Sequence, residues 1–95
     1  MRAMINISIS VFLVNAGAPV TALTPTIWVY DLTTGAVVVD GLAMTELGHG
    51  LYVYLLEATD QLHVYKWAID GGSGLSVATD RYKDGIWQNA PVKGY

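Results

Sequence analysis

Apolar and polar residues alternate from Ile5 to Val11, within a largely apolar first segment that runs from Met4 to Val14. The apolar positions of this segment are Ile5, Ile7, Ile9, Val11 and Leu13, and the residues between the first four of them are Asn6, Ser8 and Ser10. A period of two residues places alternate side chains on opposite faces of an extended strand. No window of the chain shows sustained helical spacing, so we expect an all-β fold.

The same segment imitates a secretory signal in outline. Arg2 precedes the apolar run, and Ala16-Gly17-Ala18 has the small residues of a cleavage site. However, the alternation differs from the continuous apolar run of a signal peptide, and Pro19 would directly follow the cut. We therefore expect no signal peptide. No apolar stretch approaches the roughly 18 residues of a membrane-spanning helix, so we also expect no membrane span.

Turn-forming residues divide the rest of the chain into short strands. The expected turns lie at residues 15–19, 31–35, 40–41, 48–50, 58–60 and 71–74. The expected strands between them lie at residues 26–32, 36–39, 43–47, 51–57, 62–70 and 75–79. About seven short strands predict a single antiparallel β-sandwich domain over residues 1–95, with a less regular C-terminal tail from about residue 84.

Several of these strands are apolar on both faces. The chain is 53% hydrophobic and only 14% charged, whereas roughly 25% charged residues is usual for soluble domains. Because a small sandwich has one interior layer, half of these side chains must face outward, where apolar patches usually mark protein contacts. We expect an interface that includes Phe12, Ile27, Val29, Leu51, Val53, Leu55 and Trp87. The alternative is that tyrosine side chains and loops cover the second face.

Alternation also predicts which aromatic residues are interior. Tyr65, Trp67 and Ile69 share one face of their strand, and we assign all three to the core. Trp28 and Tyr30 lie opposite Ile27 and Val29, so one of these two pairs must face outward.

Residues that carry chemistry are few and scattered. The chain has no cysteine, and its two histidines, His49 and His63, lack the spacing of a metal pair. The acidic residues occur singly, and the net charge of −3 excludes a basic nucleic-acid surface. We expect no catalytic, metal-binding or cofactor-binding residue and no nucleic-acid partner. An enzyme would require the scattered acids to cluster in space.

A second hypothesis of another class is a carbohydrate-binding or adhesin module. Exposed aromatic rings on a sheet can stack on sugar rings. Trp28 or Trp87 would provide the stacking surface.

Three groups of turn and core residues carry a family resemblance. They are Gly17-Ala18-Pro19-Val20-Thr21 with Pro25-Thr26-Ile27, Asp31-x-x-x-Gly35 with Ala43-Met44-Thr45-Glu46-Leu47-Gly48-x-Gly50-x-Tyr52-x-Tyr54, and Asp70-Gly71-Gly72 with Asp80-Arg81-Tyr82. Over roughly residues 5 to 85 the chain resembles the small immunoglobulin-like or transthyretin-like β-sandwich proteins of tailed-phage virions. The resemblance implies a non-enzymatic capsid decoration, neck, tail, fibre or baseplate component. Such a protein is made in the host cytoplasm and packs against copies of itself or other virion proteins.

Overall fold

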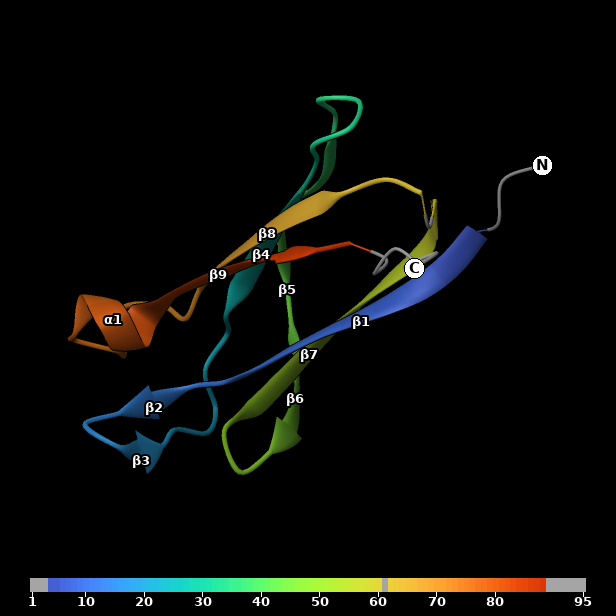
Figure 1. The fold of residues 1–95 in the computed structure, drawn as a ribbon. Coiled ribbons are helices and arrows are strands. Elements are labelled where there is room, and N and C mark those ends of the chain that lie inside the picture. The colour runs from blue at the N-terminus through green and yellow to red at the C-terminus, as the bar shows by residue number, and fades with distance from the viewer. Residues whose placement is uncertain (1–3, 61, 89–95) are drawn as a thin grey trace, which may run out of the picture.

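The computed structural model describes residues 4–60 and 62–88 and contains two main antiparallel sheets and a small hairpin (Figure 1). The three-stranded sheet contains, in spatial order, β1 (Met4–Phe12), β7 (Leu51–Asp60) and β6 (Thr45–Gly48). The four-stranded sheet contains β5 (Val37–Ala43), β4 (Thr26–Asp31), β8 (Tyr65–Asp70) and β9 (Tyr82–Trp87). The hairpin pairs β2 (Val14–Asn15) with β3 (Ala18–Pro19), and the one helix among the described residues is α1 (Ala78–Arg81).

The core lies between the two main sheets, as expected for a β-sandwich. Both sheets and the adjoining loops contribute buried apolar side chains to it. These are Ile7, Ile9, Leu13, Ile27, Val29, Val39, Met44, Tyr52, Leu56, Tyr65, Ile69 and Leu75. The predicted all-β sandwich is therefore confirmed.

The first predicted strand is present as β1. Its register with β7 pairs Ile9 with Tyr54 and Val11 with Tyr52, which places these residues on the inner face. Ile7 and Ile9 are buried, whereas Ser8 and Ser10 are exposed. The alternation in the sequence therefore corresponds directly to the two faces of the sheet.

The predicted turn at Asp40-Gly41 is wrong, because β5 continues through these residues to Ala43. The register with β4 shifts here, since Ile27 pairs with Leu42 but Trp28 pairs with Asp40, which leaves Gly41 as the extra residue. Gly41 has a φ of 69°, and a Cβ on it would lie 3.3 Å from Nε1 of Trp28. The Asp-Gly pair thus forms a bulge that accommodates the indole ring instead of a hairpin turn.

The predicted break at residues 58–60 and the predicted strand at 75–79 are also wrong. Strand β7 continues to Asp60 because it pairs with β1 as far as Met4. Residues 71–77 form a loop that leads into α1, and Leu75 anchors this loop in the core with 2% of its surface exposed. After α1 the chain forms β9, which pairs with β8. The tail predicted to be less regular from about residue 84 is therefore a strand as far as Trp87. Residues 89–95 lie outside the described part of the chain.

The reversal at residues 48–50 is a turn, as predicted, with positive φ at all three residues. Gly50 is buried, and its carbonyl accepts a hydrogen bond from Leu13 N–H at 2.9 Å. A Cβ on Gly50 would lie 3.0 Å from the carbonyl oxygen of Leu13 and 3.2 Å from the nitrogen of Val20. Only glycine fits here without displacing backbone.

We expect Gly50→Ala to lower the free energy of unfolding by about 2–4 kcal/mol, from left-handed backbone strain plus steric overlap. Gly35→Ala is the matched control, because Gly35 has nearly the same φ (81° against 82°) but open space around its Cβ position. Urea unfolding of both variants measures the difference. Equal losses would show that the close packing around Gly50 contributes nothing.

Within the described residues, no helix is long and apolar enough to cross a membrane.

Candidate functional site

Four of the seven predicted interface residues lie together on the outer face of the three-stranded sheet. We call them the outer stripe: Phe12, Leu51, Val53 and Leu55. Phe12 pairs with Leu51 across the two strands and is 63% exposed, and Leu55 is 50% exposed. Leu51 and Val53 are half-buried.

The cross-strand partners of Val53 and Leu55 are small and uncharged, whereas the exposed Glu57 lies two residues beyond Leu55 on β7. Ser10 of β1 and Thr45 of β6 both pair with Val53, and Ser8 pairs with Leu55. The central strand thus carries apolar side chains between flanking hydroxyl groups. An apolar row of this kind on a small domain is a candidate contact surface.

Ile27 and Val29 do not belong to this surface, which corrects the prediction for both residues. Each has 0% of its surface exposed, because this face of β4 packs against the three-stranded sheet. Their partners on β8, Ile69 and Trp67, also face inward. The sequence shows two apolar faces on β4, and packing selects the one with the smaller, β-branched side chains for the interior.

The opposite face of β4 is therefore the outer one. Trp28 is half-buried over Gly41, and Tyr30 is exposed next to Lys66. The Lys66 ammonium group binds the Asp84 carboxylate at 2.8 Å on the same face. This face of the four-stranded sheet is thus mixed in polarity, unlike the outer stripe.

Trp87 lies on the inner side of the edge strand β9. Its ring centroid is 6.1 Å from that of Tyr65, and it packs against the core while remaining half-buried. Tyr65 and Ile69 are buried, and Trp67 packs against the same core, so the predicted interior position of these three residues is confirmed. Neither Trp28 nor Trp87 presents a fully exposed ring of the kind that stacks on sugars.

Tyr52 and Leu56 are buried on the inner face of β7, and Tyr54 is half-buried against the core. The Tyr52 hydroxyl donates a hydrogen bond to the Val20 carbonyl at 2.9 Å and accepts one from Leu23 N–H at 3.1 Å. The side chain therefore both fills the core and holds the loop that precedes β4.

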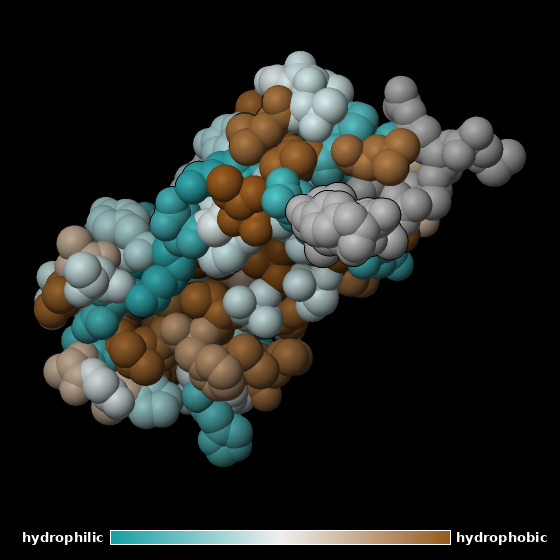
Figure 2. Space-filling model, viewed as in Figure 1, coloured by the Kyte–Doolittle hydropathy of each residue, from teal (hydrophilic) through white to brown (hydrophobic). Residues whose placement is uncertain are grey.

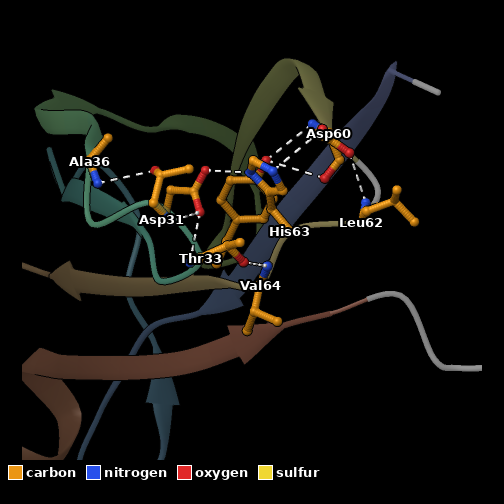
Figure 3. A network of polar contacts seen from close by, with 9 residues as sticks. Asp31, Thr33, Ala36, Asp60, Leu62, His63 and Val64 are labelled. Atoms are coloured by element: carbon orange, nitrogen blue, oxygen red, sulfur yellow. Dashed lines mark hydrogen bonds and ion pairs between the residues drawn. The ribbon is translucent and has the colours of Figure 1, made fainter. Parts of the chain in front are cut away.

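A second candidate site is the polar network at the end of the sandwich where β4 and β7 terminate (Figure 3). Nδ1 of His63 lies 2.7 Å from Oδ2 of Asp31, and Nε2 lies 3.5 Å from Oδ2 of Asp60. Figure 3 shows the imidazole ring between the two carboxylates. Both aspartates are buried, and the His63 side chain is only 15% exposed.

The surrounding backbone supports both carboxylates. Oδ1 of Asp31 accepts hydrogen bonds from the amides of Thr33 and Thr34, and Oδ1 of Asp60 accepts one from the Leu62 amide at 2.9 Å. The two hydrogen bonds to Asp31 close the turn after β4, and an aspartate at the start of a turn commonly accepts such bonds. The predicted turn at residues 31–35 is therefore present.

Electrostatics in this network favour the ionised form of Asp31. Burial by itself raises the pKa of this carboxyl group, but hydrogen bonds from His63, Thr34 and Thr33 outweigh burial and hold the pKa below its ordinary value. Burial is also the main reason why the pKa of Tyr65 is raised. The Tyr65 hydroxyl bonds to the backbone of Asp60, accepting from its N–H at 3.1 Å and donating to its carbonyl at 3.3 Å.

The network does not have the arrangement of a metal site. The two imidazole nitrogens point to different carboxylates, so the three side chains do not converge on one point. Across residues 4–60 and 62–88, no group of three or more histidine, cysteine, aspartate or glutamate side chains is arranged to hold a metal ion. The network therefore joins parts of the fold.

A further ion pair closes the loop between β8 and β9. Nε of Arg81 donates to Oδ1 of Asp70 at 2.7 Å, and a second guanidinium nitrogen donates to Oδ2 at 3.1 Å. The hydrogen bonds from Arg81 lower the pKa of the Asp70 carboxyl group. Figure 1 places α1 and the β2–β3 hairpin at the same end of the molecule, where Ala16 N–H donates to Asp80 at 3.3 Å.

The Asp31–His63–Asp60 network is not predictable from the sequence pattern. The pattern predicts the two acids as turn residues and His63 as a strand residue, because the proximity of the three side chains depends on how β4 and β7 end in space. On the face shown in Figure 2, apolar surface lies between strips of polar surface.

Comparisons with protein-family models, with curated proteins and with solved structures find no match.

Proposed function

We propose that this protein is a non-enzymatic structural subunit of a phage particle whose copies pack against one another through the outer stripe. The observation that supports this self-association is the row of apolar side chains on the outer face of the three-stranded sheet, in which Phe12 and Leu55 are at least half exposed. The assignment to a virion rests on the resemblance of the turn and core residues to phage β-sandwich proteins.

The chemistry of the stripe favours a second copy of the chain as its occupant. The outward residues Ser8, Ser10 and Phe12 on β1, and Leu51, Val53 and Leu55 on β7, carry no charge. Two copies of this six-residue surface can therefore meet about a two-fold axis centred on Val53 with no like charges among the contacting residues. Burial of about 400 Å² of apolar surface contributes on the order of 10 kcal/mol before the entropy of association is subtracted.

Sedimentation velocity at micromolar concentration tests the proposal with a charged substitution in the stripe. We expect the wild-type protein to sediment as a dimer or larger assembly and Leu55→Asp to sediment as a folded monomer of 10.2 kDa. Burying the new carboxylate at the contact is unfavourable, whereas on a free surface it is solvated. Tyr82→Asp is the control, because Tyr82 is equally exposed (55%) but lies in the other sheet.

A wild-type protein that is strictly monomeric and binds no virion component would overturn the proposal. Mass spectrometry of purified particles tests the virion assignment separately from self-association.

A further inference from the structure

We propose that the edge strand β1 pairs with β1 of a second copy, so that the three-stranded sheets of the two copies join into one continuous sheet. The proposal rests on the proposed self-association through the outer stripe and adds to it a contact made by the main chain. Strand β1 lies at one edge of its sheet. Among residues 4–60 and 62–88, only β7 pairs with it.

The hydrogen-bond pattern between β1 and β7 shows which backbone groups of β1 face outward. Leu13 N–H donates to the carbonyl of Gly50, the next residue in register, at 2.9 Å. In an antiparallel ladder, residue pairs that exchange hydrogen bonds alternate with pairs that do not. Counting back from Leu13, Val11 and Ile9 exchange hydrogen bonds with β7, because the register has no shift in this stretch.

The residues that alternate with these turn their N–H and carbonyl groups away from β7, in the plane of the sheet. They are Ser8, Ser10 and Phe12, and we call their outward backbone groups the open edge. All three residues are exposed. Their side chains project from the outer face of the sheet, whereas the open edge faces sideways. The same residues can therefore take part in both contacts.

Strand β1 is the least protected edge of the two main sheets. Natural sheets block edge pairing with charged residues, proline, bulges or short strands. Strand β9 carries Lys83 and Asp84, β5 carries the Asp40-Gly41 bulge, and β6 is four residues long and contains Glu46. In contrast, β1 is nine residues long and contains neither a charged residue nor proline. Its bulge lies near its N-terminal end, before Ile7, so the open edge is a regular template for another strand.

A second copy of β1 fits the open edge in an antiparallel register centred on Ser10. In that register Ser10 lies opposite Ser10 of the second copy, and Ser8 lies opposite Phe12. All of these residues have outward backbone groups, so each pair exchanges two hydrogen bonds. No like charges meet, because β1 is uncharged. A slip by one residue would place outward groups opposite residues already bonded to β7.

The open edge joins dimers that the outer stripe has already formed. Its hydrogen bonds replace bonds to water, so their net contribution is too small to hold two single chains together at micromolar concentration. Leu55→Asp is therefore expected to remain monomeric. A dimer presents two open edges at the rim of the stacked sheets, and a contact about a second two-fold axis extends it to four copies or to an open chain.

Sedimentation velocity of the full chain tests the edge contact with a proline that removes one outward N–H. We expect the wild-type protein to form an assembly larger than a dimer, and Ser10→Pro to stop at a dimer of twice 10.2 kDa. Proline is tolerated in an edge strand where its missing N–H faces outward. Ser10→Ala keeps the N–H, and Ile86→Pro removes an outward N–H from the edge strand β9. Both controls are expected to assemble like the wild type.

Amide exchange of the wild-type protein, followed by nuclear magnetic resonance over a dilution series, provides a second readout if Ser10→Pro does not fold. We expect exchange at Ser8, Ser10 and Phe12 to slow about tenfold once the free protein reaches about ten times the Kd of the edge contact. The Ile9 amide, which bonds to β7, is expected to be protected at every concentration.

The outcomes separate the open edge from the outer stripe. A wild-type protein that stops at the dimer, or Ser10→Pro that assembles like the wild type, would overturn the edge contact and leave the outer stripe intact. Exchange at Ser8, Ser10 and Phe12 that does not depend on concentration would also overturn it. Assembly of Leu55→Asp beyond the monomer would instead contradict the role of the outer stripe, and with it the order of assembly proposed for the open edge.

Discussion

Replacement of Tyr52 by alanine is expected to lower the free energy of unfolding by about 3–5 kcal/mol, the usual cost of truncating a large buried side chain. Tyr52 is the largest of the fully buried side chains, with 0% of its surface exposed. The substitution also removes both hydrogen bonds to the loop that carries Val20 and Leu23. Urea or thermal unfolding followed by circular dichroism measures the loss.

Two further variants separate the contributions of Tyr52. Tyr52→Phe keeps the ring and removes the hydroxyl, so we expect a loss of about 1–3 kcal/mol from the unpaired Leu23 N–H and Val20 carbonyl. Tyr54→Ala is expected to cost less than Tyr52→Ala, because Tyr54 is only half-buried. If Tyr54→Ala proved more destabilising than Tyr52→Ala, the assigned register of β7 would be incorrect.

Val29→Asp is expected to abolish folding. Val29 is completely buried in the four-stranded sheet, where it pairs with Val39 and Trp67. An isolated carboxylate at this position has no cationic partner, and its burial costs about 5 kcal/mol or more, comparable to the whole stability of a small domain. Circular dichroism and the dispersion of an NMR spectrum report whether the fold is lost.

Val53→Asp is the matched control, because it makes the same change on the outer face. We expect this variant to keep the fold and to lose self-association, since residue 53 is half-buried in the outer stripe and faces away from the core. If both variants unfolded to the same extent, residues 29 and 53 would both be interior and the two-layer description would fail.

Strand alternation was sufficient to predict the parts of the fold that depend on local chemistry. The period of two from Ile5 to Leu13 identifies β1 and its inner face, and Tyr52 and Leu56 identify the inner face of β7. The Gly48-His49-Gly50 turn is recognisable because its residues tolerate positive φ. In each case the determining interaction lies within a few residues of the chain.

The errors arose where a distant residue decides the local structure. Asp40-Gly41 has the composition of a turn but forms a bulge beneath the Trp28 ring, which lies on another strand. Residues 82–87 have weak alternation, yet they form β9 because β8 offers a complete set of pairing partners. The local strand or turn propensity of a residue does not reflect contacts with another strand, such as that of Gly41 with Trp28 or that of β9 with β8.

The same limit applies to both candidate sites. Where both faces of a strand are apolar, as in β4, periodicity separates Ile27 and Val29 from Trp28 and Tyr30 but does not show which pair is buried. Asp31 and Asp60 are 29 residues apart in the chain (60 − 31 = 29), and their carboxylates both lie next to His63. No spacing rule in the sequence indicates this contact.

A single-cysteine cross-linking experiment tests the self-association proposal most directly. The chain has no cysteine, and Val53 lies at the centre of the outer stripe, between Leu51 and Leu55. A two-fold contact centred there places the two copies of residue 53 next to each other. Under mild oxidation at micromolar concentration, we expect Val53→Cys to form a disulfide-linked dimer rapidly. We expect Ile86→Cys, which is exposed on the other sheet, to remain largely monomeric. Equal cross-linking of the two variants, or faster cross-linking of Ile86→Cys, would contradict the assignment of the outer stripe as the contact surface.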